Sequence, residues 1–137
     1  MLFNKENKNT NQTNLVKIGA LLIHAAKIDE NYSVEEEKII KNTLLNLGAD
    51  KAYLDNLMTK AQQYEKDANQ ILDFTREVKN LEDNDKIKII KSLWKIIYSN
   101  KNADIYETNL MRRLAGLLYI DSKIMGDIKE EIKKENL

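Results

Sequence analysis

The sequence contains no cysteine, no proline, only four glycines and a single histidine among its 137 residues. Without cysteine the chain cannot form disulfides, thiolate metal sites or iron–sulfur clusters, and it has no cysteine nucleophile. One histidine excludes any site built from several imidazoles, and four glycines leave little material for phosphate-binding loops or tight β-turns. These absences exclude large classes of enzyme before any motif is considered.

The sequence also lacks a net charge, because 22 basic side chains are matched by 22 acidic ones. A chain without net charge shows no electrostatic preference for nucleic acids or for anionic membranes, so we expect no nucleic acid among its partners. No apolar run reaches the about 18 residues of a transmembrane helix, and the polar leader is unlike a signal peptide. We therefore expect a cytoplasmic protein with no membrane span.

What is present is the composition of one folded domain. A chain of this length usually folds around a single core, and 42% apolar with 32% charged residues is ordinary for a globular protein. Residues 1–12 are rich in Asn and Lys and have little to bury, which predicts a disordered polar tail. Residues 13–137 are then the folded helical domain.

Apolar residues recur at helical spacing throughout that domain and predict seven helices and no strand. The first helix is expected over Asn14 to Ile28, and Ser33 with Glu36 forms a capping box that begins the second. Trp94 lies on the apolar face of the fifth helix and should be a core residue. The apolar stripes of the six later helices cover residues 39–47, 54–61, 71–78, 87–97, 110–118 and 124–132.

The first half of the chain matches the second half when it is shifted along the sequence so that Ile23 aligns with Trp94. The same shift aligns Glu36 with Glu107. Each half is a helical hairpin with one wide apolar face, and two such faces must pack on each other. The sequence therefore predicts an all-α fold, a compact bundle of about seven helices with a pseudo-twofold repeat of helical hairpins.

The second half contains the most specific motifs, LWKIIY in residues 93–98 and LMRRLAGLL in residues 110–118. Together with the acidic loop and helix in residues 21–50, they resemble the TerB family, the tellurite-resistance-B-like domain. That family repeats an acidic loop of the A-D-G-x-(I/L)-x-x-x-E type at two helix–helix junctions. The resemblance covers about residues 15–128. It implies an all-α fold without enzymatic turnover, found in stress and tellurite-resistance systems, and metal binding by the paired loops.

The candidate metal ligands are the carboxylates of the two loops. Each loop glutamate lies four residues before an apolar position of its helix, on the apolar side. If a pseudo-twofold axis brings the loops together, the crowded carboxylates need a cation or a proton. Oxygen donors favour Ca²⁺, Mg²⁺ or Mn²⁺, and the sequence requires no other cofactor. The four candidates are Asp29, Glu36, Asp104 and Glu107.

The same residues also have a purely structural interpretation. Ser33 and Glu36 form an ordinary capping box, and an acidic side chain near a helix N-terminus is favourable without any metal. The chain also departs from the family loops, because Glu30 and Lys101 replace glycines and Asn100 replaces an aspartate. These departures weaken the case for a metal and leave the fold assignment unchanged.

Two further features have a structural and a functional interpretation. His24 lies between apolar neighbours, so a half-buried packing residue is the plainer interpretation and a ligand the sharper one. A group of basic side chains on the fifth and sixth helices is either a solvated face or a docking patch for an acidic partner. The group comprises Lys88, Lys91, Lys95, Arg112 and Arg113.

The sequence thus favours a non-enzymatic domain of a stress-response system. We expect it to act by binding a protein partner that the sequence does not identify, and to bind a divalent cation weakly. One alternative is a purely structural interaction module with no ligand. The other is a metal-dependent enzyme built on carboxylates, for which the sequence offers neither a histidine cluster nor a glycine-lined pocket.

Overall fold

The structure, a computed structural model, describes residues 2–28, 32–68, 72–99 and 105–135. Within these ranges it contains seven α-helices, one short 3₁₀ helix and no strand, so the predicted all-α fold is confirmed. The elements are α1 (Leu2–Ala26), α2 (Val34–Asn46), η1 (Lys51–Tyr53), α3 (Leu54–Asp67), α4 (Leu72–Val78), α5 (Asp83–Ser99), α6 (Ile105–Leu117) and α7 (Ser122–Glu135).

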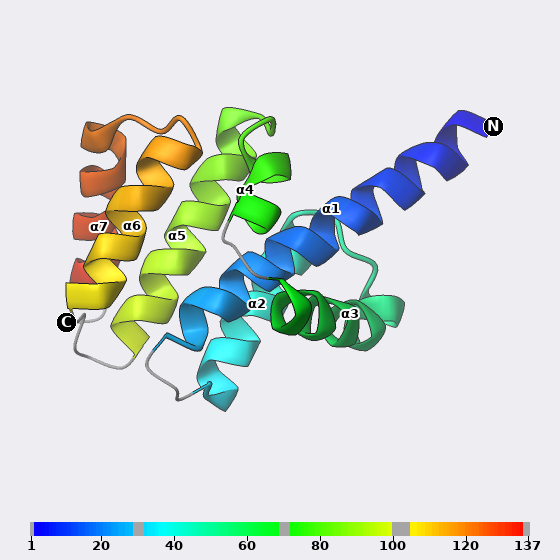
Figure 1. Cartoon of the computed structure of the whole chain (residues 1–137), viewed down its shortest axis with the longest axis horizontal. Helices are drawn as coiled ribbons and strands as arrows, with labels where there is room; N and C mark the ends of the chain where they lie inside the picture. The colour runs from blue at the N-terminus through cyan, green and yellow to red at the C-terminus, as the bar shows by residue number, and fades with distance from the viewer. Residues whose placement is uncertain (1, 29–31, 69–71, 100–104, 136–137) are drawn as a thin grey trace.

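The helices α1 and α5 form the centre of the bundle (Figure 1). α1 packs against α3, α4, α2 and α5, and α5 packs against α7, α2 and α1. Four consecutive residues of α1, from Ala20 to Ile23, are fully buried, so this turn is covered on every side. Trp94 on α5 is 2% exposed, which confirms its predicted place in the core.

The close approach of α1 and α3 depends on a glycine. A Cβ atom added to Gly19 would lie 2.9 Å from the Cβ atom of Ala61 on α3. Real Cβ atoms do not approach one another so closely, so any larger residue would push the two helices apart. Gly19 therefore allows the most extensive helix pair of the fold to form.

α1 begins earlier than the sequence predicted. The expected start was Asn14, whereas the helix begins at Leu2, and its first part extends beyond the other helices (Figure 1). Residues 2–13 contain neither glycine nor proline, so nothing in them ends the helix on its N-terminal side. A disordered tail over residues 1–12 stays a prediction.

Two helix junctions have matching boundaries and cap bonds under the shift predicted from the sequence. The shift that aligns Ile23 with Trp94 also superposes the first and last residues of α2 on those of α6. At the end of α2 the N–H of Ala49 donates to the carbonyl of Leu44 (2.9 Å), and at the end of α6 the N–H of Ile120 donates to the carbonyl of Ala115 (2.9 Å). These two bonds are related by the same shift. The match is local, and the pseudo-twofold axis stays a prediction.

The next helix after each of these junctions also begins in the same way. Asp50 accepts a hydrogen bond from the N–H of Ala52 (3.0 Å), and Asp121 accepts one from the N–H of Lys123 (2.8 Å). A carboxylate that accepts the backbone donors of the first turn is a standard helix start. The segment that Asp50 begins is η1, which leads into α3.

Candidate functional site

The N-terminus of α2 is the part of the candidate metal site that the structure describes. Ser33 has an extended backbone (φ −92°, ψ 164°), and its hydroxyl oxygen accepts from the N–H of Glu36 (3.1 Å). In return a carboxylate oxygen of Glu36 accepts from the N–H of Ser33 (2.8 Å). The capping box predicted from the sequence is therefore confirmed, and it satisfies two backbone donors that the helix leaves unpaired.

Glu36 is a buried carboxylate, with 1% of its surface exposed. An ionised carboxylate in such a place is stable only where hydrogen bonds or opposite charge replace its hydration. The bond from the Ser33 N–H supplies part of that replacement. Burial fixes the position of the Glu36 side chain. The contacts that its carboxylate can make therefore depend on the geometry of the α2 N-terminus.

Tyr32 immediately precedes Ser33, and its hydroxyl group is buried. Burial, then the Glu37 carboxylate and, least of the three, the Glu36 carboxylate raise the pKa of Tyr32 to about 12, while the Gln62 side chain opposes the rise. All three causes of the rise disfavour a second negative charge at this place. The entry to α2 is thus a region of negative potential with a neutral tyrosine in it.

The other three predicted ligands cannot be placed in the same way. Asp29 and Asp104 lie outside the described residues, and so does the side chain of Glu107, although its backbone is the third residue of α6. Glu36 is likewise the third residue of α2. Among the side chains that are described, no group of three or more His, Asp or Glu residues could hold a metal ion. The convergence of the four carboxylates stays a prediction.

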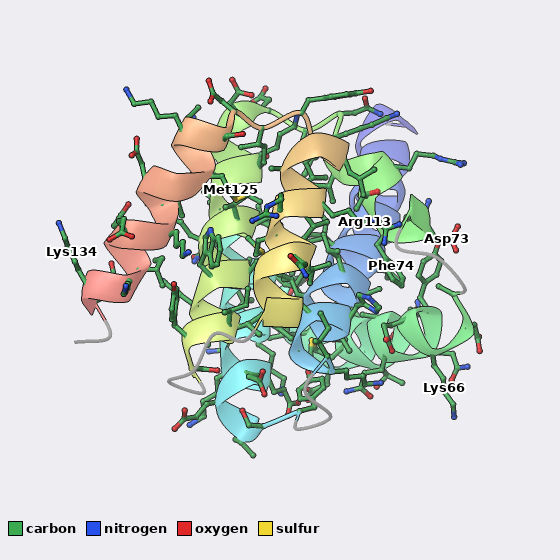
Figure 2. The ribbon with its side chains drawn as sticks, turned by 60° about the vertical axis from the view of Figure 1, so that its left-hand side comes forward. Lys66, Asp73, Phe74, Arg113, Met125 and Lys134 are labelled. Carbon is green, nitrogen blue, oxygen red and sulfur yellow. The ribbon has the colours of Figure 1, made fainter. Side chains whose placement is uncertain are left out.

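His24 is a half-buried residue that packs against an aromatic ring, as its plainer interpretation predicted. Its ring centroid lies 5.7 Å from that of Phe74, which Figure 2 shows between α1 and α3. The sequence did not indicate its second contact, in which Nδ1 lies 3.5 Å from a carboxylate oxygen of Glu65. The other oxygen of Glu65 accepts from the Lys27 ammonium group (3.1 Å).

The five basic residues named in the sequence analysis differ in their surroundings. Three of them, Lys88, Lys91 and Lys95, line a pocket of about 180 Å³ between α2 and α5. Arg112 and Arg113 are exposed on α6 and do not line it. Figure 2 labels Arg113. The three lysines therefore border the pocket from α5, while the two arginines are exposed residues of α6.

This pocket was not predicted from the sequence, although the sequence contained a signal for it. Thr43 and Ser92 are hydroxyl residues within the apolar stripes of α2 and α5, and both are buried in the structure. Their hydroxyl groups bond to each other across the interface of the two helices. A buried polar residue in an apolar stripe needs such a partner, and the partner here lies 49 residues away in the chain.

Comparison with known proteins supports the resemblance seen in the sequence. The family model described as "Tellurite resistance protein TerB" matches residues 15–130, which is most of the chain. No curated protein and no solved structure matches it. The matched range includes both helix junctions of the repeat and the whole pocket between α2 and α5. In the described residues no helix is long and apolar enough to cross a membrane.

Proposed function

The chain belongs to the TerB family, and from that premise we propose that it is a non-enzymatic binding domain of a tellurite-resistance-type stress response. It binds a partner protein, and it binds a divalent cation weakly through the acidic residues at the entries to α2 and α6. The observation that carries the proposal is the family match over residues 15–130. The cation ligands are Asp29, Glu36, Asp104 and Glu107.

The non-enzymatic part of the proposal is supported by the contacts that the histidine and the buried serine make. The chain has no cysteine, and its one histidine, His24, packs on Phe74 and contacts Glu65. The buried serine of α5, Ser92, bonds to Thr43 and to the carbonyl of Lys88, with no histidine among these partners. A nucleophile needs a base within hydrogen-bond distance, and these contacts supply none.

The cation-binding part is supported by the repeated helix entries. The two glutamates occupy the same position in α2 and α6, whose boundaries coincide under the shift that defines the repeat. Oxygen-only ligands favour Mg²⁺, Ca²⁺ or Mn²⁺. Because few charged ligands are available, the dissociation constant should be on the order of 10⁻⁴ to 10⁻³ M. A structural interaction module without a ligand would show no such binding.

Thermal unfolding with and without the cation tests this part. At a cation concentration about ten times the dissociation constant, linkage stabilises the protein by about 1.4 kcal/mol, or roughly 5 °C in Tm. Glu36→Gln and Glu107→Gln should each abolish this shift and keep most of the cap, since Gln also serves at that position. Glu35→Gln is the matched control, because Glu35 is exposed in the same turn as Glu36.

Each outcome of the melting experiment has a definite meaning. If millimolar Ca²⁺, Mg²⁺ and Mn²⁺ leave Tm unchanged, the carboxylates are caps and the cation-binding part of the proposal is wrong. If the control variant loses the shift together with Glu36→Gln, the cation binds to the general negative potential of the α2 entry. Loss in the two glutamine variants alone supports the paired site.

The stress-response part has its own test in cells. Deleting the gene should lower growth on tellurite-containing medium, and the wild-type gene should restore it. A complementing copy that carries Glu36→Gln separates the two parts of the proposal. Unchanged tellurite tolerance in the deletion strain would contradict the stress-response role.

A further inference from the structure

The pocket between α2 and α5, hereafter the α2–α5 pocket, combines a cationic rim with a polar floor. Its volume of about 180 Å³ is well below the about 300 Å³ at which pockets for drug-sized ligands begin, so it suits a small group. Among the described residues, no acidic one lines it. The lining residues are Ile39, Asn42, Thr43, Asn46, Lys88, Lys91, Ser92 and Lys95.

The floor of the pocket consists of two hydroxyl groups. Thr43 is 5% exposed and Ser92 is 6% exposed, and the two hydroxyls bond to each other. Each hydroxyl also lies within hydrogen-bond distance of a carbonyl oxygen, Thr43 of that of Ile39 (2.8 Å) and Ser92 of that of Lys88 (3.0 Å). Because each hydroxyl has a single proton, one of them donates to its carbonyl while the other donates to that hydroxyl. Both carbonyls belong to helices in which backbone N–H groups bond to them as well. A hydroxyl can therefore turn toward a ligand without leaving a buried carbonyl unpaired.

The rim consists of three lysines that make only weak ion pairs or none with the described residues. Lys88 lies 3.8 Å from a carboxylate oxygen of Asp85, and Lys91 lies 3.4 Å from one of Glu131. Ion pairs exposed to this degree are worth at most about 1 kcal/mol and can be exchanged for a better partner. Within the described part of the chain, Lys95 makes no ion pair.

The helix dipole of α2 works against an anion here, because Asn46 is the last residue of that helix. Lys88 offsets this effect directly, since its ammonium group donates to the carbonyl of Asn46 (3.4 Å). Asp85 and Glu131 pair with two of the three ammonium groups, which leaves one net positive charge beside the pocket against a partial charge of about −0.5 at the helix end. The potential in the α2–α5 pocket is therefore positive.

From this geometry we propose that the α2–α5 pocket binds a small oxyanion of the phosphate type. The three lysines supply the charge and the rim donors. The side-chain amides of Asn42 and Asn46 supply further donors, and a hydroxyl of the floor binds the oxygen that enters deepest. The same chemistry serves inorganic phosphate and the terminal phosphate of a small phosphomonoester. This proposal is independent of the acidic loops and of the proposed function.

An NMR titration with inorganic phosphate at low ionic strength tests the proposal. We expect the amide resonances of Asn42, Thr43 and Ser92 to shift together, with a dissociation constant of about 1 mM or tighter. Added chloride salt should weaken the binding, because it screens the lysines. Lys95→Gln should weaken it about tenfold, and Lys60→Gln, an exposed lysine of α3, is the matched control with the same loss of charge.

Two comparison ligands define the class of the occupant. A nucleoside monophosphate that shifts the same resonances more strongly than inorganic phosphate shows that the pocket takes a phosphate carried on a small molecule. Equal binding shows that the free anion is sufficient, and both results support the proposal. A glutamate-rich peptide that shifts these resonances while phosphate does not would overturn it in favour of an acidic protein partner.

Two further outcomes would also overturn the proposal. One is that about 20 mM phosphate, about twenty times the expected dissociation constant, leaves the Thr43 and Ser92 resonances unmoved. The other is that Lys95→Gln and Lys60→Gln weaken binding equally, because that shows attraction to overall charge instead of to this pocket. Both variants replace exposed side chains, so their folding can be verified by unchanged circular dichroism before the titration.

Discussion

The junction after α2 and the junction after α6 share three equivalent backbone hydrogen bonds and have different residues at their centre. Gly48 has φ +106° in the first junction, and Tyr119 has φ +56° in the second. Glycine adopts positive φ freely, whereas a tyrosine there is strained by about 1 to 2 kcal/mol. Equivalent cap bonds form at both junctions, so these bonds determine the geometry of the turn. The glycine lowers the strain of that geometry and is not required for it.

The two junctions are also held from the same helix, α5, with different strength. The ammonium group of Lys86 is buried and donates to the carbonyl of Leu118 (3.0 Å), while the exposed Lys88 donates to the carbonyl of Asn46 (3.4 Å). A cation at a helix C-terminus is favourable, and more so when it is shielded from water. The junction that contains the strained tyrosine is therefore the one with the stronger anchor.

The largest effect should come from the core positions that the repeat aligns. Trp94→Ala should cost about 3 to 5 kcal/mol, and Ile23→Ala about 2 to 5 kcal/mol, because both side chains are buried. Urea unfolding measures both costs. A loss below about 1 kcal/mol at either position would show that the half of the chain containing that residue contributes little to the core. The two halves would then not be equivalent. Tryptophan emission like that of indole in water would contradict the burial of Trp94.

The next largest effect should distinguish the two lysine anchors. Lys86→Ala should cost about 1.5 to 3 kcal/mol, the range for a hydrogen bond from a charged group. Lys88→Ala should change the free energy of unfolding by no more than about 0.5 kcal/mol, since its contact is exposed and longer. Lys86→Met keeps the apolar stem and should recover part of the loss. Equal costs for both alanine variants would show that the two junctions are anchored alike.

Substitutions at the centres of the two junctions should change the free energy of unfolding in opposite directions. Gly48→Ala should destabilise by about 1 kcal/mol through backbone strain alone, because an added Cβ atom meets nothing within 4 Å. Tyr119→Gly should stabilise by up to about 1 kcal/mol, as relief of strain exceeds the extra freedom of the unfolded chain. Tyr119→Ala keeps the strain and serves as the control. If the alanine variant is as stable as the glycine variant, the gain comes from removing the exposed aromatic ring. The backbone at position 119 would then not be strained.

The smallest effect at neutral pH belongs to Tyr32, whose counterpart in the repeat is Ala103. The folded pKa of about 12 exceeds the ordinary value of 10.0, so the folded state keeps a proton that the unfolded chain releases. Its contribution to stability is complete below pH 10 and is lost as the pH rises toward 12. Tyr32→Phe should remove this part of the alkaline loss and change little at pH 7. Identical alkaline profiles of the two proteins would contradict the shift.

The elements of this fold could be predicted largely because their signals are local. Apolar periodicity indicates each helix, and the spacing of Ser33 and Glu36 predicts the cap that the structure shows. The start of α1 was missed because a polar segment without glycine or proline has no local stop signal. The α2–α5 pocket was missed because it depends on the contact of Thr43 with Ser92, which only packing creates. The proposed pairing of the two acidic entries would be of the same non-local kind.

That pairing can be measured directly by paramagnetic broadening with Mn²⁺. If the entries to α2 and α6 share one weakly bound cation, the amide signals of Ser33 to Glu36 and of Ile105 to Glu107 should lose intensity at the same low Mn²⁺ concentration. Glu36→Gln should then protect both segments at once. Broadening at one entry alone, or at neither, would contradict the paired cation site.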